Sequence, residues 1–277
     1  MRQRKEREEF QQKQYDKQQV EIEKAERFIR KNKAGSKSTM AKSREKKLSH
    51  MDKIDPPSTN ISASFNFPYE DTGSHEALTV EKLSVGYNKP LLAPVTFTIS
   101  MGEKVGFSGF NGVGKSTLIK TILKKLPAKG GTAKFSPSAI INYFSQDLAW
   151  DNNRMTPMQI ISDKYPKLSQ RTIRTKLAKC GLDAQNAIKP IHELSGGEQT
   201  KVKLAMMEFV PSNFLIMDEP TNHLDEETKE ALKRAIDRFS GNVIIVSHEN
   251  SFYEGLVDKV LNVEKLSLRE RAKNETL

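Results

Sequence analysis

The chain has 277 residues, of which 36% are hydrophobic and 29% charged, and its formal net charge is +10. This length accommodates one large domain, or one domain with an appendage, and no apolar run approaches the roughly 18 residues of a membrane helix. The charged N-terminus lacks the apolar segment of a secretory signal, and a single cysteine, Cys180, excludes a disulfide framework. Composition therefore argues against membrane-spanning and disulfide-rich secreted proteins and favours the reducing cytoplasm.

An antiparallel helical hairpin is predicted for residues 1–55. Gly and Pro are absent up to residue 33, and apolar residues recur there every seven positions, which is the narrow seam of a coiled coil. A turn is expected at residues 34–39 and a second helix at about residues 40–53, before Pro56 ends it. The residues of the seam are Tyr15, Ile22 and Ile29.

The excess positive charge lies almost wholly on this hairpin. Residues 1–54 hold 17 Lys+Arg and 9 Asp+Glu, a net of +8, and the remainder of the chain has a net of +2. A basic arm of this kind is compatible with a polyanion partner, and equally with the solvated surface of a coiled coil. The expected tip of the hairpin carries Arg30, Lys31, Lys33, Lys37 and Lys42.

A connecting segment at residues 56–75 leads into a domain expected at residues 76–265, which a short tail at residues 266–277 follows. The first part of the domain, residues 77–99, reads as two strands, because apolar residues alternate and β-branched and aromatic types are frequent. Tyr87 lies between the two β runs. Its ring either stacks on a nucleotide base or belongs to an ordinary turn.

The sequence GFNGVGKST at residues 109–117 matches a phosphate-binding loop. A short apolar strand is predicted before it and a helix at residues 118–126 after it, which is the context that this motif requires. Glycines let backbone N–H groups approach phosphate oxygens, Lys115 is expected on the β- and γ-phosphates, and Ser116 on Mg²⁺. The expected nucleotide-binding residues here are Gly109, Asn111, Gly112, Gly114, Lys115, Ser116 and Thr117.

Polar residues follow three further predicted strands. Gln146 ends the first, Asp218 and Glu219 end the second, and His248 ends the third. Ligands of open α/β sheets bind at the carboxyl ends of strands, so Gln146 and Asp218 are expected to hold Mg²⁺. Gln146 is also a catalytic candidate, expected to bind the attacking water. Glu219 is then expected to orient and deprotonate water, and His248 to contact the γ-phosphate. Each residue alone is compatible with a structural role, but the phosphate loop favours catalysis.

Residues 157–185 have helical periodicity and precede the sequence LSGGEQ at residues 194–199. Ser195 and Glu198 have the spacing of a capping box. The motif is therefore either a capped helix that contains glycines or a second anion site, because the N–H groups of such a helix start point outward. The candidate residues for an anion site are Ser195, Gly196, Gly197 and Glu198.

In this order, the motifs resemble an ABC-type ATPase cassette over about residues 76–265. The sequences FLIMDEP at residues 214–220 and TNHLD at residues 221–225, with LSGGEQTKVKLA, resemble the ABC-F branch. Its members have two cassettes on one chain, joined by a basic two-helix linker. Residues 1–55 resemble that linker, so the chain looks like a linker followed by a second cassette, and the first cassette is missing from this sequence.

The resemblance implies an α/β fold of the P-loop NTPase class, namely an ABC-type nucleotide-binding domain with a helical insertion, preceded by an antiparallel α-helical hairpin. It implies Mg²⁺-dependent ATP hydrolysis between two cassettes in a head-to-tail sandwich. The second cassette is either the missing N-terminal half or another copy of this chain. In such a sandwich, residues 195–198 act on the ATP that the partner cassette holds.

The ABC-F resemblance also implies ATP-dependent ribosome binding in the cytoplasm, without membrane insertion, by a translation factor or an antibiotic-resistance protein that protects the ribosome. RNA would then be the partner of residues 1–54. One alternative is the ATP-binding subunit of an ABC transporter, against which the basic hairpin argues. Another is a non-catalytic RNA-binding or dimerisation module, against which Glu219 and His248 argue.

Overall fold

The computed structural model describes residues 63–71 and 76–265, together with isolated helical residues between positions 17 and 43. The chain divides into two units, Met1–Asn60 and Ile61–Leu277, and the fold described below is that of the second unit. The predicted hairpin pairing, the seam of residues 1–33 and the tail at residues 266–277 lie outside the described residues, so they stay predictions.

A five-stranded parallel sheet forms the centre of the second unit. Of its three inner strands, β6 and β7 are buried throughout, because side chains cover both faces of a parallel sheet. In spatial order the strands are β5 (Ile141–Phe144), β6 (Phe214–Asp218), β7 (Asn242–Val246), β3 (Lys104–Ser108) and β8 (Lys259–Asn262).

The same unit contains a second sheet, which has three antiparallel strands in the order β2-β1-β4. The predicted strands β1 (Glu76–Ser84) and β2 (Val95–Ser100) are confirmed, whereas β4 (Gly130–Phe135) was not predicted. The sequence GGTAKF of β4 is largely exposed and lacks apolar alternation, so only its pairing with β1 makes it a strand. At the bulge between β1 and β4, a Cβ atom on residue 131 would lie 2.1 Å from the carbonyl oxygen of Lys82. Glycine has no Cβ atom, so it is the residue that fits at Gly131.

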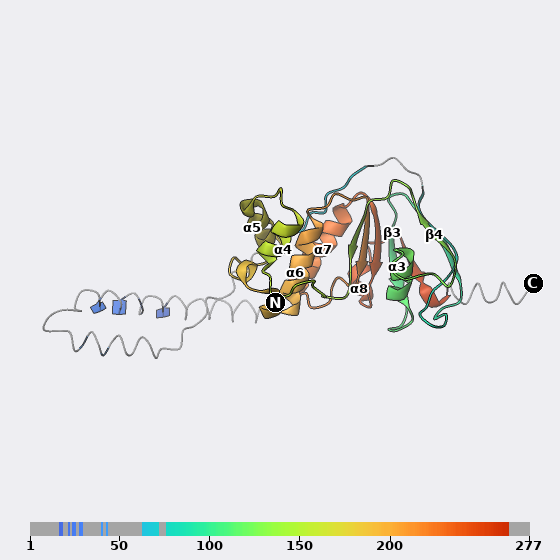
Figure 1. The fold of residues 1–277 in the computed structure, drawn as a ribbon. Helices are drawn as coiled ribbons and strands as arrows, with labels where there is room; N and C mark the ends of the chain where they lie inside the picture. Colours follow the sequence, from blue (N-terminus) through green and yellow to red (C-terminus); the bar gives the residue numbers. More distant parts are fainter. Residues whose placement is uncertain are drawn as a thin grey trace, which may run out of the picture. The chain divides into compact units, whose positions relative to one another are not determined.

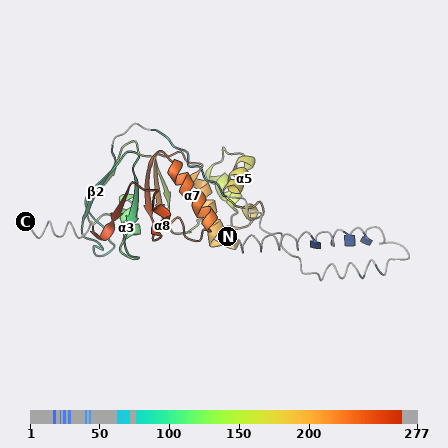
Figure 2. The same ribbon diagram turned by 180° about the vertical axis from the view of Figure 1, so that it is seen from behind.

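Helices cover the two faces of the parallel sheet unequally. Figure 1 shows α4, α5 and α6 gathered on one side, while α3 lies between the parallel sheet and the antiparallel sheet, and Figure 2 shows the same arrangement from behind. The helices are α3 (Lys115–Ile122), α4 (Pro157–Lys164), α5 (Gln170–Lys179), α6 (Gly196–Met207), α7 (Glu226–Arg238) and the single turn α8 (Asn250–Tyr253), with short 3₁₀ turns at Asn186–Ile188 and Ile191–Glu193.

Helix α3 begins inside the phosphate loop and ends four residues before the predicted end at residue 126. Lys124 has a positive φ of 57°, and the N–H of Lys125 donates to the carbonyl oxygen of Lys120 over 2.8 Å. The N–H of Lys124 also donates to Thr121. These two bonds form a Schellman motif, which satisfies the last carbonyl groups of a helix and ends it.

The predicted helical insertion consists of two helices, α4 and α5. Thr156 caps α4 with a capping box, and Ser169 caps α5 by accepting a hydrogen bond from the N–H of Thr172. Between them Tyr165 precedes Pro166 and leaves the helical region, with φ −130° and ψ 69°. A residue before proline is sterically disfavoured in the helical conformation, so the break is local in origin.

Residues 63–71 belong to the predicted connecting segment, and they pack on the helical insertion. Ala63, Phe65 and Phe67 are buried in the core that α4 to α7 form with one face of the parallel sheet. The N–H of Ser64 donates to the carbonyl oxygen of Lys179 over 2.7 Å, and that of Asn66 donates to Glu208 over 3.0 Å. Residues 63–71 therefore tie this end of the unit to α5 and α6.

Candidate nucleotide-binding site

A cavity of about 490 Å³ lies at the carboxyl edge of the parallel sheet, where α3 begins. Its walls come from the loops after β3, β5, β6 and β7, because parallel strands deliver their carboxyl ends to one edge of a sheet. The predicted site residues from all four loops therefore meet there. The cavity is lined by Asn111, Gly112, Gly114, Lys115, Ser116, Thr117, Gln146, Glu219, Asn222 and His248.

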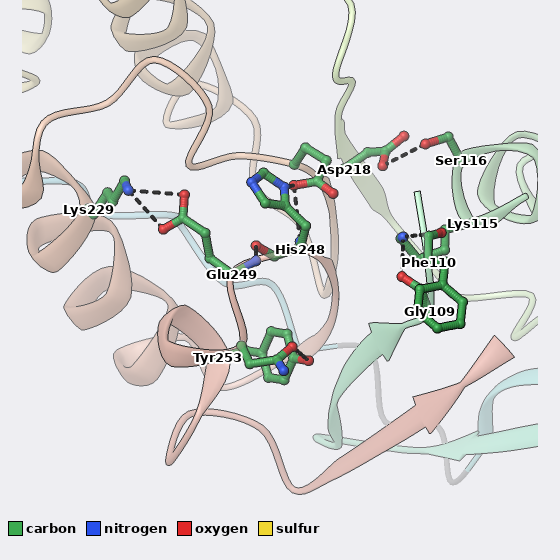
Figure 3. Close-up of polar contacts among 12 residues, drawn as sticks. Gly109, Phe110, Lys115, Ser116, Asp218, Lys229, His248, Glu249 and Tyr253 are labelled. Carbon is green, nitrogen blue, oxygen red and sulfur yellow. Dashed lines mark hydrogen bonds and ion pairs between the residues drawn. The ribbon is translucent and has the colours of Figure 1, made fainter. Parts of the chain in front are cut away.

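The phosphate loop wraps around the amine of Lys115. This side chain is buried, and its Nζ donates to the carbonyl oxygens of Gly109 over 2.8 Å and of Phe110 over 3.1 Å (Figure 3). Gly114 takes a left-handed φ of 107° and makes no side-chain cap for α3. The first N–H groups of α3 are thus left for a ligand, and an anion is the ligand that a helix N-terminus favours.

Asp218 is the most deeply buried acid of the site. Ser116 Oγ donates to Asp218 Oδ1 over 3.0 Å, as Figure 3 shows, and Asp218 Oδ2 is buried without a hydrogen-bond partner among the described residues. Burial raises the pKa of the Asp218 carboxyl to about 6; the Ser116 hydrogen bond opposes this shift and the charge of Glu219 adds to it. A carboxylate with an open oxygen beside a serine hydroxyl fits Mg²⁺, which prefers such ligands.

Asp218→Asn is expected to raise the free energy of unfolding by about 2–3 kcal/mol at pH 7.5 without Mg²⁺. The folded-state pKa of about 6 exceeds the ordinary value of 3.8, so the ionised carboxylate destabilises the fold above pH 6. The penalty shrinks as the pH falls from 6 towards 4, because the buried group then binds its proton. Urea unfolding of both proteins at pH 7.5 and pH 4.5 measures this. An advantage that is equal at both pH values would contradict it.

Glu219 and His248 form the second polar pair of the cavity. Glu219 Oε2 lies 2.7 Å from His248 Nδ1 and accepts a hydrogen bond from the His248 N–H over 3.3 Å. The backbone of Glu219 has a positive φ of 51°, and its N–H donates to the carbonyl oxygen of Val246 over 2.8 Å. A non-glycine residue in this conformation is strained by about 1–3 kcal/mol, and such strain is typical of active sites.

Four residues depart from the sequence-based expectations for the cavity: Gly109, Asp218 and Tyr87 do not line it, whereas Asn222 does. Tyr87 is 56% exposed and does not line it, so its predicted stacking on a base stays a prediction. Asn222 does line it, although sequence reasoning interpreted TNHLD only as a polar turn that ends in a helix cap. Its position three residues after Glu219, in the loop that follows β6, was a signal that could have identified it.

The LSGGEQ motif lies outside this cavity. Ser195 and Glu198 form the predicted capping box: Ser195 Oγ accepts from the N–H of Glu198, and the Glu198 carboxylate accepts from the N–H of Ser195 over 2.8 Å. The glycines also have an intramolecular role, because a Cβ on Gly197 would lie 2.5 Å from the carbonyl oxygen of His223. The helix start is therefore packed against the loop that begins at Glu219, and none of residues 195–198 lines the described cavity.

No described helix has the length and apolar character needed to cross a membrane. Among the same residues, no group of three or more His, Cys, Asp or Glu side chains has the arrangement of a metal-binding cluster.

The fold and the site together define a class of protein. A phosphate-binding loop between β3 and α3, an acidic pair after β6 and a histidine after β7 are the parts of a P-loop nucleotide-binding domain. The helical insertion beside the parallel sheet is the addition that the resemblance led us to expect of the ABC type.

Comparison with known proteins places the chain in a family. Two family profiles, both described as ABC transporter, match residues 92–222 and residues 1–67. The chain is 36% identical to the putative ATP-binding protein YdiF of Bacillus subtilis, covering 93% of this chain and 41% of that protein. It is 32% identical to ABC transporter F family member 5 of Arabidopsis thaliana, covering 93% of this chain and 38% of that protein.

A solved structure supports the same class. A putative ABC transporter ATP-binding protein from Pyrococcus furiosus superposes with a TM-score of 0.57 at 28% identity, over 69% of this chain and 98% of that one. The chain belongs to the ABC family, and its relatives include an F-family member, as its motifs indicated. It spans less than half the length of the two curated relatives named above.

Proposed function

We propose that this chain is an ABC-F-type cassette that binds Mg·ATP in the 490 Å³ cavity and hydrolyses it together with a second cassette. The proposal rests on three features that lie together at the carboxyl edge of the parallel sheet. These are a lysine held inside a phosphate loop, a buried Asp218 with an open oxygen, and the Glu219–His248 pair. Hydrolysis needs all three: phosphate binding, charge neutralisation and a positioned water.

The binding roles follow from the positions of the side chains. Lys115 and the N–H groups at the start of α3 bind the β- and γ-phosphate oxygens, since they are the cationic and dipolar groups at this edge of the sheet. Ser116, Asp218 and Gln146 hold Mg²⁺ from the β3, β6 and β5 sides of the cavity. When bound, Mg²⁺ neutralises part of the charge on the phosphate oxygens.

Glu219 and His248 have the roles that act on the water. Glu219 Oε2 is engaged by His248, and Oε1 is left to accept a hydrogen bond from water and then its proton. His248 holds the carboxylate in place through Nδ1–H, and Nε2 donates a hydrogen bond to the γ-phosphate when that nitrogen also carries a proton. The strained backbone of Glu219 keeps the carboxylate at the strand end in this orientation.

A second cassette completes the site. Residues 195–198 lie outside the cavity that holds Lys115, so we propose that their helix start contacts the γ-phosphate bound to a partner cassette. The partner is the other cassette of a longer protein or another copy of this chain. The 41% coverage of the Bacillus relative is compatible with either source.

The partner that we propose for residues 1–54 is ribosomal RNA in the cytoplasm. Support comes from the net charge of +8 on this segment and from the second family profile, which matches residues 1–67. The F-family relative supports the same branch. The alternative of an ATP-binding subunit that docks on a membrane partner is favoured by the description that both family profiles carry.

Ribosome binding is tested by co-sedimentation of the whole chain at several salt concentrations. Changing Arg30, Lys31, Lys33, Lys37 and Lys42 together to Gln is expected to weaken binding at least about tenfold and to flatten its salt dependence, because fewer counterions are released. A matched control changes five exposed cassette lysines to Gln: Lys89, Lys124, Lys129, Lys134 and Lys167. Equal losses in both variants would contradict an RNA contact at the hairpin, and pelleting with membranes instead would favour the transporter alternative.

A further inference from the structure

An ion-pair cluster lies beside the cavity and has no role in the function proposed above. Lys229 Nζ in α7 contacts both oxygens of Glu249, at 2.8 Å and 3.0 Å, as Figure 3 shows. It also lies 3.1 Å from an oxygen of Glu226, one turn earlier in α7. Glu249 directly follows His248 in the chain. The cluster therefore joins a helix to the residue next to the histidine of the site.

The turn that carries His248 has few other restraints. β7 ends at Val246, and the N–H of Glu249 donates to Ser247 Oγ over 3.1 Å. The helix that follows, α8, is a single turn, and the Glu249 side chain does not cap it. In the described part of the chain, the hydrogen bonds between side chains that join this turn to another element are those of His248 with Glu219 and of Glu249 with Lys229.

Helix α7 is a rigid support for that tie. It has 13 residues, its N-cap Asp225 accepts a hydrogen bond from the N–H of Thr228, and it buries Ala231, Leu232 and Ile236 in the core. The Lys229 side chain is 16% exposed and that of Glu249 is 30% exposed. Water therefore screens the pair only partly, and removal of the lysine leaves a half-buried carboxylate without its cation.

We propose that Lys229 is a positioning residue for His248: it holds the Ser247–Glu249 turn through Glu249, so that His248 Nδ1 stays on Glu219 and Nε2 is presented to the phosphate. The inference rests on the function proposed for the cavity. It adds a residue from α7 that touches neither nucleotide nor metal. The consequence is that loss of the pair frees the imidazole to rotate and to exchange tautomers.

The tautomer of His248 is read from the ring ¹⁵N chemical shifts of the nucleotide-free, Mg²⁺-free chain, and His248→Gln assigns this ring among the five histidines. We expect the Nδ1–H form in the native protein, because Nδ1 donates to Glu219. Lys229→Met is expected to give a mixture of the two tautomers, and Lys229→Arg to restore the native shifts. Native shifts in Lys229→Met would overturn the proposal.

The matched control is Lys233→Met, one turn further along α7. Lys233 Nζ contacts the carbonyl oxygens of Ser251 and Glu254, beyond the turn that carries His248. This variant removes the same charge from the same helix and is expected to leave the His248 shifts unchanged. A change of equal size in both lysine variants would show a general effect of α7 and would overturn the specific role of Lys229.

Kinetics give a second measurement. Lys229→Met is expected to lower kcat for ATP about 5- to 10-fold, with KM changed less than about twofold, because the histidine is misplaced and the phosphate loop is intact. Lys229→Arg is expected to recover most of kcat. A rise in KM with unchanged kcat would overturn the role. A native chain that neither binds nor hydrolyses Mg·ATP would contradict the function proposed for the cavity, while the ¹⁵N shifts still decide the role of Lys229.

Discussion

Glu219→Gln is expected to lower kcat for ATP hydrolysis by about 10²- to 10³-fold while leaving the affinity for Mg·ATP within about threefold. The carboxylate is buried beside His248 at the end of β6, where it can take a proton from water, and an amide cannot. Glutamine has nearly the same shape and still accepts a hydrogen bond from the imidazole. The substitution therefore removes the general base but keeps the shape of the cavity lining.

Two measurements test the Glu219→Gln prediction. Phosphate release gives kcat, and fluorescence titration with a labelled ATP gives the affinity; the exposed Glu230→Gln in α7 is the matched control and is expected to behave as the native chain. Because bound ATP is not consumed, gel filtration with Mg·ATP is expected to show more dimer than with Mg·ADP. Unchanged kcat would refute the role of Glu219, and an unchanged elution volume would refute the closed dimer of this chain.

Lys115→Ala is expected to weaken Mg·ATP binding by about 100-fold, since charged hydrogen bonds are worth roughly 1.5–3 kcal/mol each. The ammonium is buried and held by the carbonyl oxygens of Gly109 and Phe110, so it is already in place within the loop before any phosphate binds. Preorganisation of this kind means that little side-chain entropy is lost on binding. The same variant is expected to lack measurable ATPase activity at ordinary ATP concentrations.

The matched control for Lys115→Ala is Lys120→Ala, further along the same helix α3. Lys120 pairs with Asp147 over 3.5 Å near the surface and does not line the cavity, so its loss is expected to change the affinity less than about twofold. Thermal unfolding of both variants shows whether the loop has kept its fold. Native-like binding by Lys115→Ala would refute the assignment of the cavity to a nucleotide.

The parts of the site that were predictable from sequence share a physical feature. The phosphate loop, the acids after β6 and the histidine after β7 each follow an apolar run that forms a buried strand, and parallel strands must bring those ends together. Local signals were also sufficient for the capping box of Ser195 and Glu198, because its hydrogen bonds join residues three positions apart. Periodicity and caps are short-range properties.

Other features depended on contacts between distant segments. β4 is a strand because β1 lies beside it, and residues 63–71 are packed because Glu208 and Lys179 accept their N–H groups. The need for glycine at position 197 comes from the carbonyl oxygen of His223, which follows it by more than twenty residues. No pattern within any one of these segments carries that information.

The sequence by itself determined the class of protein, the order of its motifs and the chemistry that each motif offers, because these depend on residue type and short spacing. The tertiary structure alone decided which groups meet. It gave Asp218 a raised pKa and an open oxygen, placed Lys229 on Glu249 beside His248, and kept residues 195–198 away from the cavity of their own chain. Burial and long-range electrostatics depend on the positions of all packed segments, so they appear only once the chain has folded.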